Sequence, residues 1–138
     1  GLLMRQGEVD MCITGTDRVL ANGDVINKIG TYLKALAAFD NNIPFYVALP
    51  GTTIDSENDR ILKNMIEYRS PEELTHIEGI DDDGVLKKIR IFPKDCDALN
   101  PAFDVTPGKL ITGLITEKGV FKSTAEGLSK YYSSSIEI

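Results

Sequence analysis

Side chains suited to acid–base and phosphate chemistry lie close together in one stretch of the sequence, residues 13–31. Asp17 can give or take a proton, and Lys28 can neutralise an anion. Asn22 and Asn27 add amides that can hydrogen-bond hydroxyl groups. An acid beside anion-binding groups is what chemistry on a sugar phosphate needs, because the phosphate charge must be neutralised while a proton moves nearby.

The elements around this stretch place it at the edge of a sheet. The apolar run 8–13 predicts a strand buried on both faces, and helical periodicity predicts a helix over 24–39, whose amino terminus would offer free N–H groups to an anion. A second strand is predicted over 43–49, which makes a β–α–β unit of an α/β fold. The polar loop 50–53 then follows this second strand on the same sheet edge as Asp17. Ligands of open α/β sheets bind at this edge, so we expect the loop to form the second wall of a site.

Further along the chain, Ser70 to Glu73 has the composition of a helix start, and residues 85–91 are predicted as an edge strand. Thr106 is predicted as the N-cap of a helix that Gly119 closes. Ser123 is expected to start a last short helix.

Two of the acids have structural alternatives. Asp17 and Arg18 could form a salt-bridged pair that only stabilises the loop. Asp104, in the loop 100–107, could cap backbone N–H groups near the helix that Pro107 begins, and this alternative is as well supported as a role in a site. His76 is the single histidine, and its carboxylate-rich surroundings favour a surface residue over a catalyst.

Composition excludes several classes of function. The net charge of −6, spread along the 138 residues, argues against nonspecific nucleic-acid binding. No apolar run approaches the length of about 20 residues that a membrane span needs. Cys12 and Cys96 lack metal-ligand spacing and fit a reducing, cytoplasmic setting, with Cys12 expected as a buried, inert thiol. The glycines of the stretch do not have the spacing of a dinucleotide fingerprint, which disfavours a nicotinamide site.

Many joined motifs of this chain resemble, in order, those of the methylthioribose-1-phosphate isomerases. They are Gly15-Thr16-Asp17-Arg18-Val19, Ala21-Asn22-Gly23-Asp24, Asn27-Lys28-Ile29-Gly30-Thr31, Ile43-Pro44-Phe45-Tyr46-Val47-Ala48, Thr53-Ile54-Asp55, Pro71-Glu72-Glu73-Leu74-Thr75-His76, Asn100-Pro101-Ala102-Phe103-Asp104-Val105-Thr106-Pro107, Leu110-Ile111-Thr112 and Ile115-Thr116-Glu117-Lys118-Gly119-Val120. The wider family also includes ribose-1,5-bisphosphate isomerases and regulatory subunits of the translation initiation factor 2B exchange factor. The resemblance covers nearly the whole chain.

The resemblance implies a Rossmann-like fold, with an open, mostly parallel sheet and helices on both faces, and conversion of 5-methylthioribose 1-phosphate to 5-methylthioribulose 1-phosphate in methionine salvage. By position, Asp17 is similar to the general acid/base of the family, and Asn27 and Lys28 to its substrate contacts. Asn22 and Asp104 are expected beside these residues, without direct contact to substrate. The resemblance implies no metal and no organic cofactor.

The resemblance also bears on the extent and assembly of the protein. Residues 1–6 resemble the end of a helix, so residues 1–138 are expected to be one carboxy-terminal catalytic domain of a longer chain. The family's catalytic cysteine would then lie upstream, and Cys12 does not match its motif. A homodimer is expected, with candidate surfaces on the first helix, on the segment 111–115 and on Tyr131-Tyr132.

Two residues depart from the usual pattern of the family, and two alternative functions remain. Thr16 replaces a usual alanine and puts a hydroxyl beside the acid, and Tyr68 stands where a second acid is common. The alternative functions are a ribose-1,5-bisphosphate isomerase and a non-catalytic regulatory subunit related to the exchange factor. The presence of Asp17 favours an enzyme, because a subunit that only senses a ligand needs no acid.

Overall fold

The computed structural model describes residues 1–61 and 65–135, and the chain divides into two compact units. The first unit comprises residues 1–65 and 103–138, and the second comprises residues 66–102. The chain begins with the short helix α1 (Leu2–Arg5), and Gly7 follows it with a φ of +77°. The Glu8 amide donates to the Leu3 carbonyl, so the predicted helix end closed by a left-handed glycine is confirmed.

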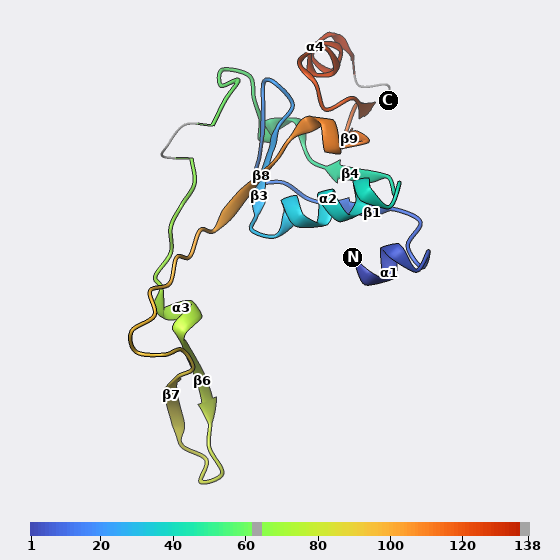
Figure 1. The fold of residues 1–138 in the computed structure, drawn as a ribbon. Coiled ribbons are helices and arrows are strands. Elements are labelled where there is room, and N and C mark those ends of the chain that lie inside the picture. The colour runs from blue at the N-terminus through green and yellow to red at the C-terminus, as the bar shows by residue number, and fades with distance from the viewer. Residues whose placement is uncertain (62–64, 136–138) are drawn as a thin grey trace. The chain divides into compact units, whose positions relative to one another are not determined.

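One four-stranded sheet of the first unit has the order β1 (Cys12–Thr14), β4 (Phe45–Ala48), β9 (Gly113–Thr116) and β10 (Gly119–Phe121) (Figure 1). β1, β4 and β9 are parallel, and β10 returns antiparallel to β9. The predicted parallel pairing of β1 with β4 across an intervening helix, α2 (Thr31–Asp40), is confirmed. The prediction that β1 is buried on both faces is wrong, because β1 is the end strand of this sheet and Ile13 is 60% exposed.

A second four-stranded sheet has the order β5 (Ile54–Asp55), β2 (Arg18–Leu20), β3 (Val25–Lys28) and β8 (Phe103–Thr106). Its pairings are antiparallel except for β2 with β5, so the expectation of a mostly parallel sheet holds only for the first sheet. The fold is therefore a mixed α/β arrangement of open sheets. This second sheet was not predicted from the sequence.

The helix predicted to begin at residue 24 begins seven residues later, because β3 occupies its first part. Asn22-Gly23 forms the tight turn of the β2–β3 hairpin, with Gly23 at a φ of +94°. The β-branched residues Val25 and Ile26 then pair with β2. Gly30, at a φ of +95°, ends the strand segment and precedes the helix, so its backbone conformation sets the true helix start.

The helix predicted from residue 106 to residue 119 is wrong. Residues 108–110 form a single 3₁₀ turn, η2 (Gly108–Leu110), and the following apolar residues form β9 between β4 and β10. A central strand is covered on both faces, so its apolar run has no strict alternation and matches a helical stripe by accident. Gly113 confirms the close packing of this strand, since a Cβ there would lie 2.8 Å from the Val120 side chain.

Helix α4 (Ala125–Ser133) confirms the predicted last helix, with its cap one residue later than expected. The Thr124 hydroxyl accepts a hydrogen bond from the Gly127 amide at 3.1 Å. Tyr131 of this helix is buried, and so are Ile111 and Leu114. Among the expected dimer surfaces, Ile111, Leu114 and Tyr131 are therefore not available for a contact. Tyr132, and Leu2 and Leu3 of α1, are exposed.

The core of the first unit joins both sheets to the helices. Apolar side chains of β2, β3, β4, β9, α2 and α4 pack in one cluster, whose buried members are Val19, Val25, Ala35, Ala38, Phe45, Val47, Leu49, Leu110, Ile111, Leu114 and Leu128. The small alanines of α2 allow this helix to lie close to β4 and β8. The loops at the carboxyl ends of β1 and β4 therefore start from a packed base.

Thr106 is fully buried, and among the residues that the structure describes its hydroxyl has no hydrogen-bond partner. Thr106→Val is expected to raise the free energy of unfolding by about 1 kcal/mol, because an unsatisfied buried hydroxyl is replaced by a methyl group of the same shape. Thermal unfolding of the two chains should show a rise in Tm of about 3 °C.

Thr112→Val is the matched control for this substitution. The Thr112 hydroxyl accepts a hydrogen bond from the Phe45 amide at 2.9 Å, so its loss should lower the Tm. A Thr106→Val chain with a Tm equal to or below that of the unsubstituted chain would show that the buried Thr106 hydroxyl does not destabilise the fold.

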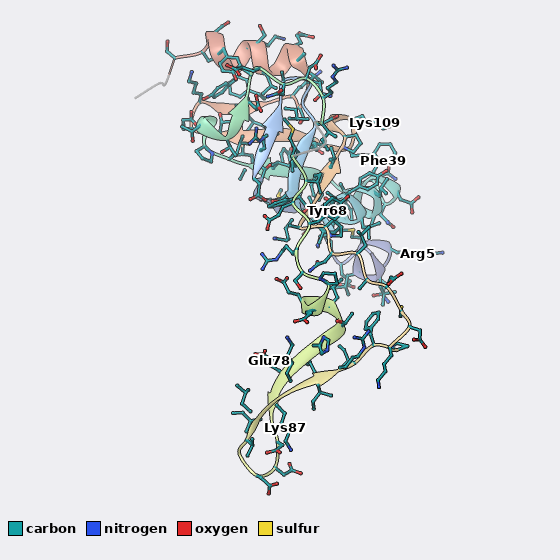
Figure 2. All side chains as sticks on the ribbon, turned by 90° about the vertical axis from the view of Figure 1, so that its left-hand side faces the viewer. Arg5, Phe39, Tyr68, Glu78, Lys87 and Lys109 are labelled. Atoms are coloured by element: carbon teal, nitrogen blue, oxygen red, sulfur yellow. The ribbon has the colours of Figure 1, made fainter. Side chains whose placement is uncertain are left out.

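The second unit is built on a β-hairpin. The short helix α3 (Glu72–Thr75) precedes β6 (His76–Ile80), which pairs antiparallel with β7 (Leu86–Arg90) (Figures 1 and 2). A helix does begin in the predicted segment, but its N-cap is Pro71 and not Ser70; the Ser70 hydroxyl accepts from the Glu72 amide at 3.2 Å. The predicted edge strand is also confirmed, as part of this separate two-stranded sheet. In the described part of the chain no helix is long and apolar enough to cross a membrane.

Candidate active site

The loop that follows β1 is held by backbone hydrogen bonds to β3. The Thr16 hydroxyl contacts the Ile26 carbonyl at 2.8 Å, and the Asp17 amide donates to the same carbonyl at 3.0 Å. Arg18 is also paired with Ile26, so two successive residues lie opposite one, as in a β-bulge. The Thr16 hydroxyl thus binds the backbone and fixes the loop, which leaves the neighbouring carboxylate of Asp17 at the end of an anchored segment.

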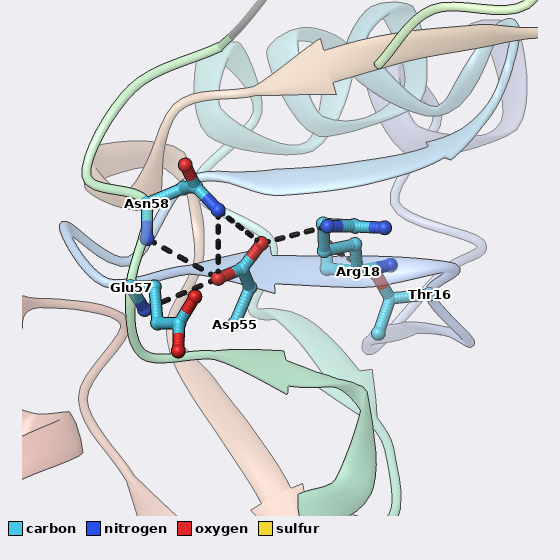
Figure 3. Close-up of polar contacts among 5 residues, drawn as sticks. All are labelled: Thr16, Arg18, Asp55, Glu57 and Asn58. Carbon is cyan, nitrogen blue, oxygen red and sulfur yellow. Dashed lines mark hydrogen bonds and ion pairs between the residues drawn. The ribbon is translucent and has the colours of Figure 1, made fainter.

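Arg18 is paired with Asp55 and not with Asp17. Its Nη1 donates to Asp55 Oδ2 at 2.7 Å (Figure 3). In the described ranges the Asp17 carboxylate makes no hydrogen bond or ion pair. The alternative of a structural Asp17–Arg18 pair is therefore wrong. The Asp17 side chain is exposed and its carboxylate remains available to a ligand.

Asp55 collects several donors at once. The Asn58 side-chain amide donates to both of its oxygens, at 3.0 and 2.9 Å, and the amides of Glu57 and Asn58 donate to Oδ1 (Figure 3). These bonds, from the Asn58 side chain first and Arg18 next, lower the pKa of Asp55 below its ordinary value. Asp55 was not predicted as a functional residue, although an Asp in a loop often accepts backbone N–H groups that follow it in the chain.

Asp55→Asn is expected to lower the free energy of unfolding at neutral pH by about 1 kcal/mol, because a charged acceptor of several hydrogen bonds is lost. The pKa of Asp55 is lowered in the folded state, so its stabilisation is complete above the unfolded-state pKa of about 3.9. That stabilisation disappears as the pH falls through the lower folded-state pKa. Urea unfolding of both chains at several pH values measures the difference.

Asp59→Asn serves as the control, because Asp59 is an exposed acid nearby that accepts none of these hydrogen bonds. Its effect on stability should be small at every pH. A difference between the Asp55→Asn chain and the unsubstituted chain that stays constant from neutral to strongly acidic pH would show that the Asp55 charge is not responsible.

A polar cleft of about 440 Å³ lies beside Asp17. It is lined by Asp17 and Arg18 on one side and by 52–55 on the other. The latter residues belong to the 3₁₀ turn η1 (Gly51–Thr53) and to β5, which follow the carboxyl end of β4. The prediction that the loop after the second strand forms the second wall of the Asp17 site is therefore confirmed for Thr52 and Thr53.

Asn27 and Lys28 line a different cleft of about 500 Å³, together with Thr14, Thr31 and Lys34. The Asn27 side-chain amide donates to the hydroxyls of Thr14 and Thr31, at 3.1 and 3.0 Å, and so links β1 to the start of α2. The Lys28 ammonium lies 4.9 Å from the centre of the Phe103 ring. Two lysines and an amide oxygen can together bind a phosphate or a hydroxyl-rich ligand.

The two clefts are adjacent along the chain. Thr14 lines the second cleft, and Asp17, three residues later, lines the first. On β3, the carbonyl of Ile26 holds the Asp17 loop while the next residue, Asn27, faces the second cleft. The acid and the cationic groups therefore occupy neighbouring positions at one end of the β2–β3 hairpin.

Asp104 caps helix α2. Its Oδ2 accepts from the Gly30 amide at 2.7 Å, and both oxygens accept from the Tyr32 amide. The prediction that Asp104 caps backbone N–H groups is thus confirmed, but the helix that it caps is α2 and not one that begins at Pro107. Two of the N–H groups that were expected to be free for an anion at this amino terminus, those of Gly30 and Tyr32, are therefore bound by the Asp104 carboxylate.

Asn22 lies in the turn at the opposite end of the β2–β3 hairpin from Asp17 and Asn27. Its side chain hydrogen-bonds Asp24, whose carboxylate also accepts from the Gly108 amide at 2.9 Å. A Cβ on Gly23 would overlap the Ser123 carbonyl. Asn22 therefore belongs to a tightly packed structural turn, and the structure does not bring it to the clefts.

Other residues considered from the sequence lie apart from this arrangement or play minor parts in it. His76 belongs to the second unit, where its Nδ1 lies 2.9 Å from the Thr75 hydroxyl. Cys12 is half-buried and lines the second cleft, so the expectation of a fully buried thiol is wrong. Lys34, which also lines the second cleft, was not predicted as a binding residue; its position one turn into α2 is the signal that could have indicated it.

Residues 1–123 match the model of the Initiation factor 2 subunit family. The chain belongs to this family. It is 58% identical over 130 residues to a methylthioribose-1-phosphate isomerase of Methylocella silvestris, a match that covers 94% of this chain and 36% of the relative. The chain thus spans about 36% of the length of such curated relatives.

Solved structures of the family are also similar to this chain. A 5-methylthioribose 1-phosphate isomerase from Pyrococcus horikoshii OT3 superposes with a TM-score of 0.79 at 43% identity, over 96% of this chain and 35% of that one. The delta subunit of translation initiation factor eIF-2B from A. fulgidus superposes with a TM-score of 0.76 at 40% identity, over 96% and 36% respectively. Both branches of the family share the fold of this segment.

Proposed function

We propose that residues 1–138 are the carboxy-terminal, Rossmann-like catalytic domain of a methylthioribose-1-phosphate isomerase. The complete enzyme converts 5-methylthioribose 1-phosphate to 5-methylthioribulose 1-phosphate, an aldose–ketose isomerisation. The observation that carries the proposal is the unpaired Asp17 carboxylate, in a polar cleft beside a cationic cleft, within the described residues. Relatives that carry this name and are 53–58% identical over nearly the whole chain support it.

The chemistry assigns Asp17 the proton transfers. The substrate carries its phosphate on the anomeric carbon, so its ring cannot open as that of a free sugar does. Asp17 assists ring opening as an acid and then serves the transfer of hydrogen between C2 and C1. The loop anchored at Thr16 and Arg18 keeps the carboxylate in place, which limits the reorganisation needed during reaction.

Lys28 and Asn27 are assigned to substrate binding. The Lys28 ammonium, with Lys34 in the same cleft, compensates the phosphate charge, and the Asn27 carbonyl oxygen accepts from a sugar hydroxyl. Asp104 and the Thr14 hydroxyl keep this wall in place through α2 and Asn27. We propose no metal and no organic cofactor, because these proton transfers need neither.

A regulatory subunit of the exchange-factor branch is the second candidate, supported by the superposition on the A. fulgidus delta subunit. The two candidates differ in turnover. The complete protein incubated with 5-methylthioribose 1-phosphate should yield the ketose, followed by ¹³C NMR of the C1 and C2 carbons. Binding of this substrate without product would instead support the regulatory subunit, and turnover of ribose 1,5-bisphosphate alone would assign the other isomerase branch.

We also propose that the enzyme is a homodimer. Exposed apolar residues on α1 and α2 are candidates for the contact: Leu2, Leu3, Leu33 and Phe39. Sedimentation of the complete enzyme across a dilution series measures its oligomeric state. A monomer at every concentration would refute the homodimer.

A further inference from the structure

Glu117, directly after β9, makes two hydrogen bonds that reach the loop beside the proposed acid. The Tyr131 hydroxyl of α4 donates to Oε1 at 2.8 Å, and the Gly51 amide donates to Oε2 at 2.9 Å. Both carboxylate oxygens are therefore engaged. The Tyr131 hydrogen bond lowers the pKa of Glu117, and the same bond raises the pKa of Tyr131 to about 12. The pair keeps the same protonation states through the neutral range.

Tyr131 is fixed from several sides. The Tyr131 ring meets the Phe121 ring edge to face, with 5.6 Å between ring centres. The Lys118 ammonium lies 4.5 Å from the centre of the Tyr131 ring. Lys118 also donates to the Tyr131 carbonyl at 3.3 Å. Gly51 approaches so closely that a Cβ there would overlap the Tyr131 hydroxyl. The contact between α4 and the loop after β4 thus depends on a glycine at position 51.

Gly51 is the first residue of the 3₁₀ turn η1, which carries Thr52 and Thr53 into the Asp17 cleft. Thr52 lines both this cleft and the neighbouring cavity of Glu117 and Tyr131. The carboxyl ends of the parallel strands β1, β4 and β9 supply Asp17, the threonines and Glu117 in turn. Glu117 therefore contacts the turn η1, and η1 in turn supplies the threonines that line the Asp17 cleft.

We propose that Glu117 and Tyr131 are positioning residues of the active site, which hold η1 so that Thr52 and Thr53 face the substrate beside Asp17. This inference rests on the proposed isomerase function. Neither residue touches the substrate; they act through the Gly51 amide. A loop held in its working geometry before binding reduces the cost of ordering it with the substrate, and displacement of such a group lowers catalysis.

The test compares three variants in the complete enzyme. Glu117→Ala removes both hydrogen bonds and should lower kcat/KM about tenfold, since small displacements of positioning groups have effects of this order or larger. Glu117→Gln keeps an acceptor oxygen and should restore most of the activity. Tyr131→Phe keeps the packing of the ring, so it should fold, and should lower kcat/KM by a few-fold.

Thr124→Ala is the matched control. It removes the cap of α4 and destabilises the same helix, but leaves the Glu117 hydrogen bonds intact. It should lower the Tm without changing kcat/KM. The proposal is overturned if Glu117→Ala and Tyr131→Phe retain the kcat/KM of the unsubstituted enzyme, or if their losses are no larger than that of Thr124→Ala.

Amide hydrogen exchange tests the positioning contact independently of the isomerase activity. The Gly51 amide should exchange at least several-fold faster in Glu117→Ala than in Thr124→Ala. If the unsubstituted protein is inactive but the Gly51 amide still exchanges faster in Glu117→Ala than in Thr124→Ala, the proposed function is refuted while the η1 contact stands. Unchanged exchange at Gly51 would refute the positioning role, whatever the activity.

Discussion

Asp17→Asn in the proposed complete isomerase is expected to lower kcat by roughly 10²–10⁴-fold with little change in KM, the usual contribution of a positioned acid/base. Asparagine preserves the size of the side chain but can neither donate nor accept the proton. The loop should keep its conformation, because its anchors are the Thr16 hydroxyl and the backbone of Asp17 and not the carboxylate. Steady-state kinetics with 5-methylthioribose 1-phosphate measure both constants.

Asp10→Asn is the matched control for this prediction. Asp10 is an exposed acid shortly before β1 and does not line the Asp17 cleft. Its substitution changes the net charge equally and should leave kcat within about twofold. If Asp17→Asn retained activity within a few-fold of the unsubstituted enzyme, Asp17 could not be the acid/base of the reaction.

Lys28→Ala is expected to raise KM roughly 10- to 100-fold with a smaller effect on kcat, because a hydrogen bond between charged groups contributes about 1.5–3 kcal/mol. Lys28 is exposed and lines the same cleft as Lys34. Its present contact is with the face of the Phe103 ring. Loss of that contact alone is a modest structural change, so the variant should fold and report on binding.

Lys109→Ala controls for the loss of one positive charge, since Lys109 is exposed and lies outside the clefts of Asp17 and Lys28. The KM of this variant should stay within about twofold of the original value. An unchanged KM for Lys28→Ala would show that Lys28 does not bind the phosphate. In that case Lys34, in the same cleft, becomes the next residue to substitute.

Local sequence signals predicted the elements that depend on near neighbours. The β1–α2–β4 unit, the glycine that ends α1, the hairpin partner over 85–91 and the helix α4 all follow from turn residues, caps and apolar runs within a few positions. The wall formed by Thr52 and Thr53 beside Asp17 was predictable as well, because the carboxyl ends of neighbouring parallel strands share one edge.

The sequence by itself determined that this chain is an α/β member of its family and that Asp17 follows a strand end, because strand ends and an acid in a glycine-bearing loop are local features. The tertiary structure alone decided that Val25–Lys28 and Gly113–Thr116 are strands. In both, pairing with strands distant in sequence overrides a helical periodicity. It also decided that Asp104 caps α2 and that Glu117 reaches Gly51, since each contact spans more than sixty residues of the chain and no local pattern encodes it.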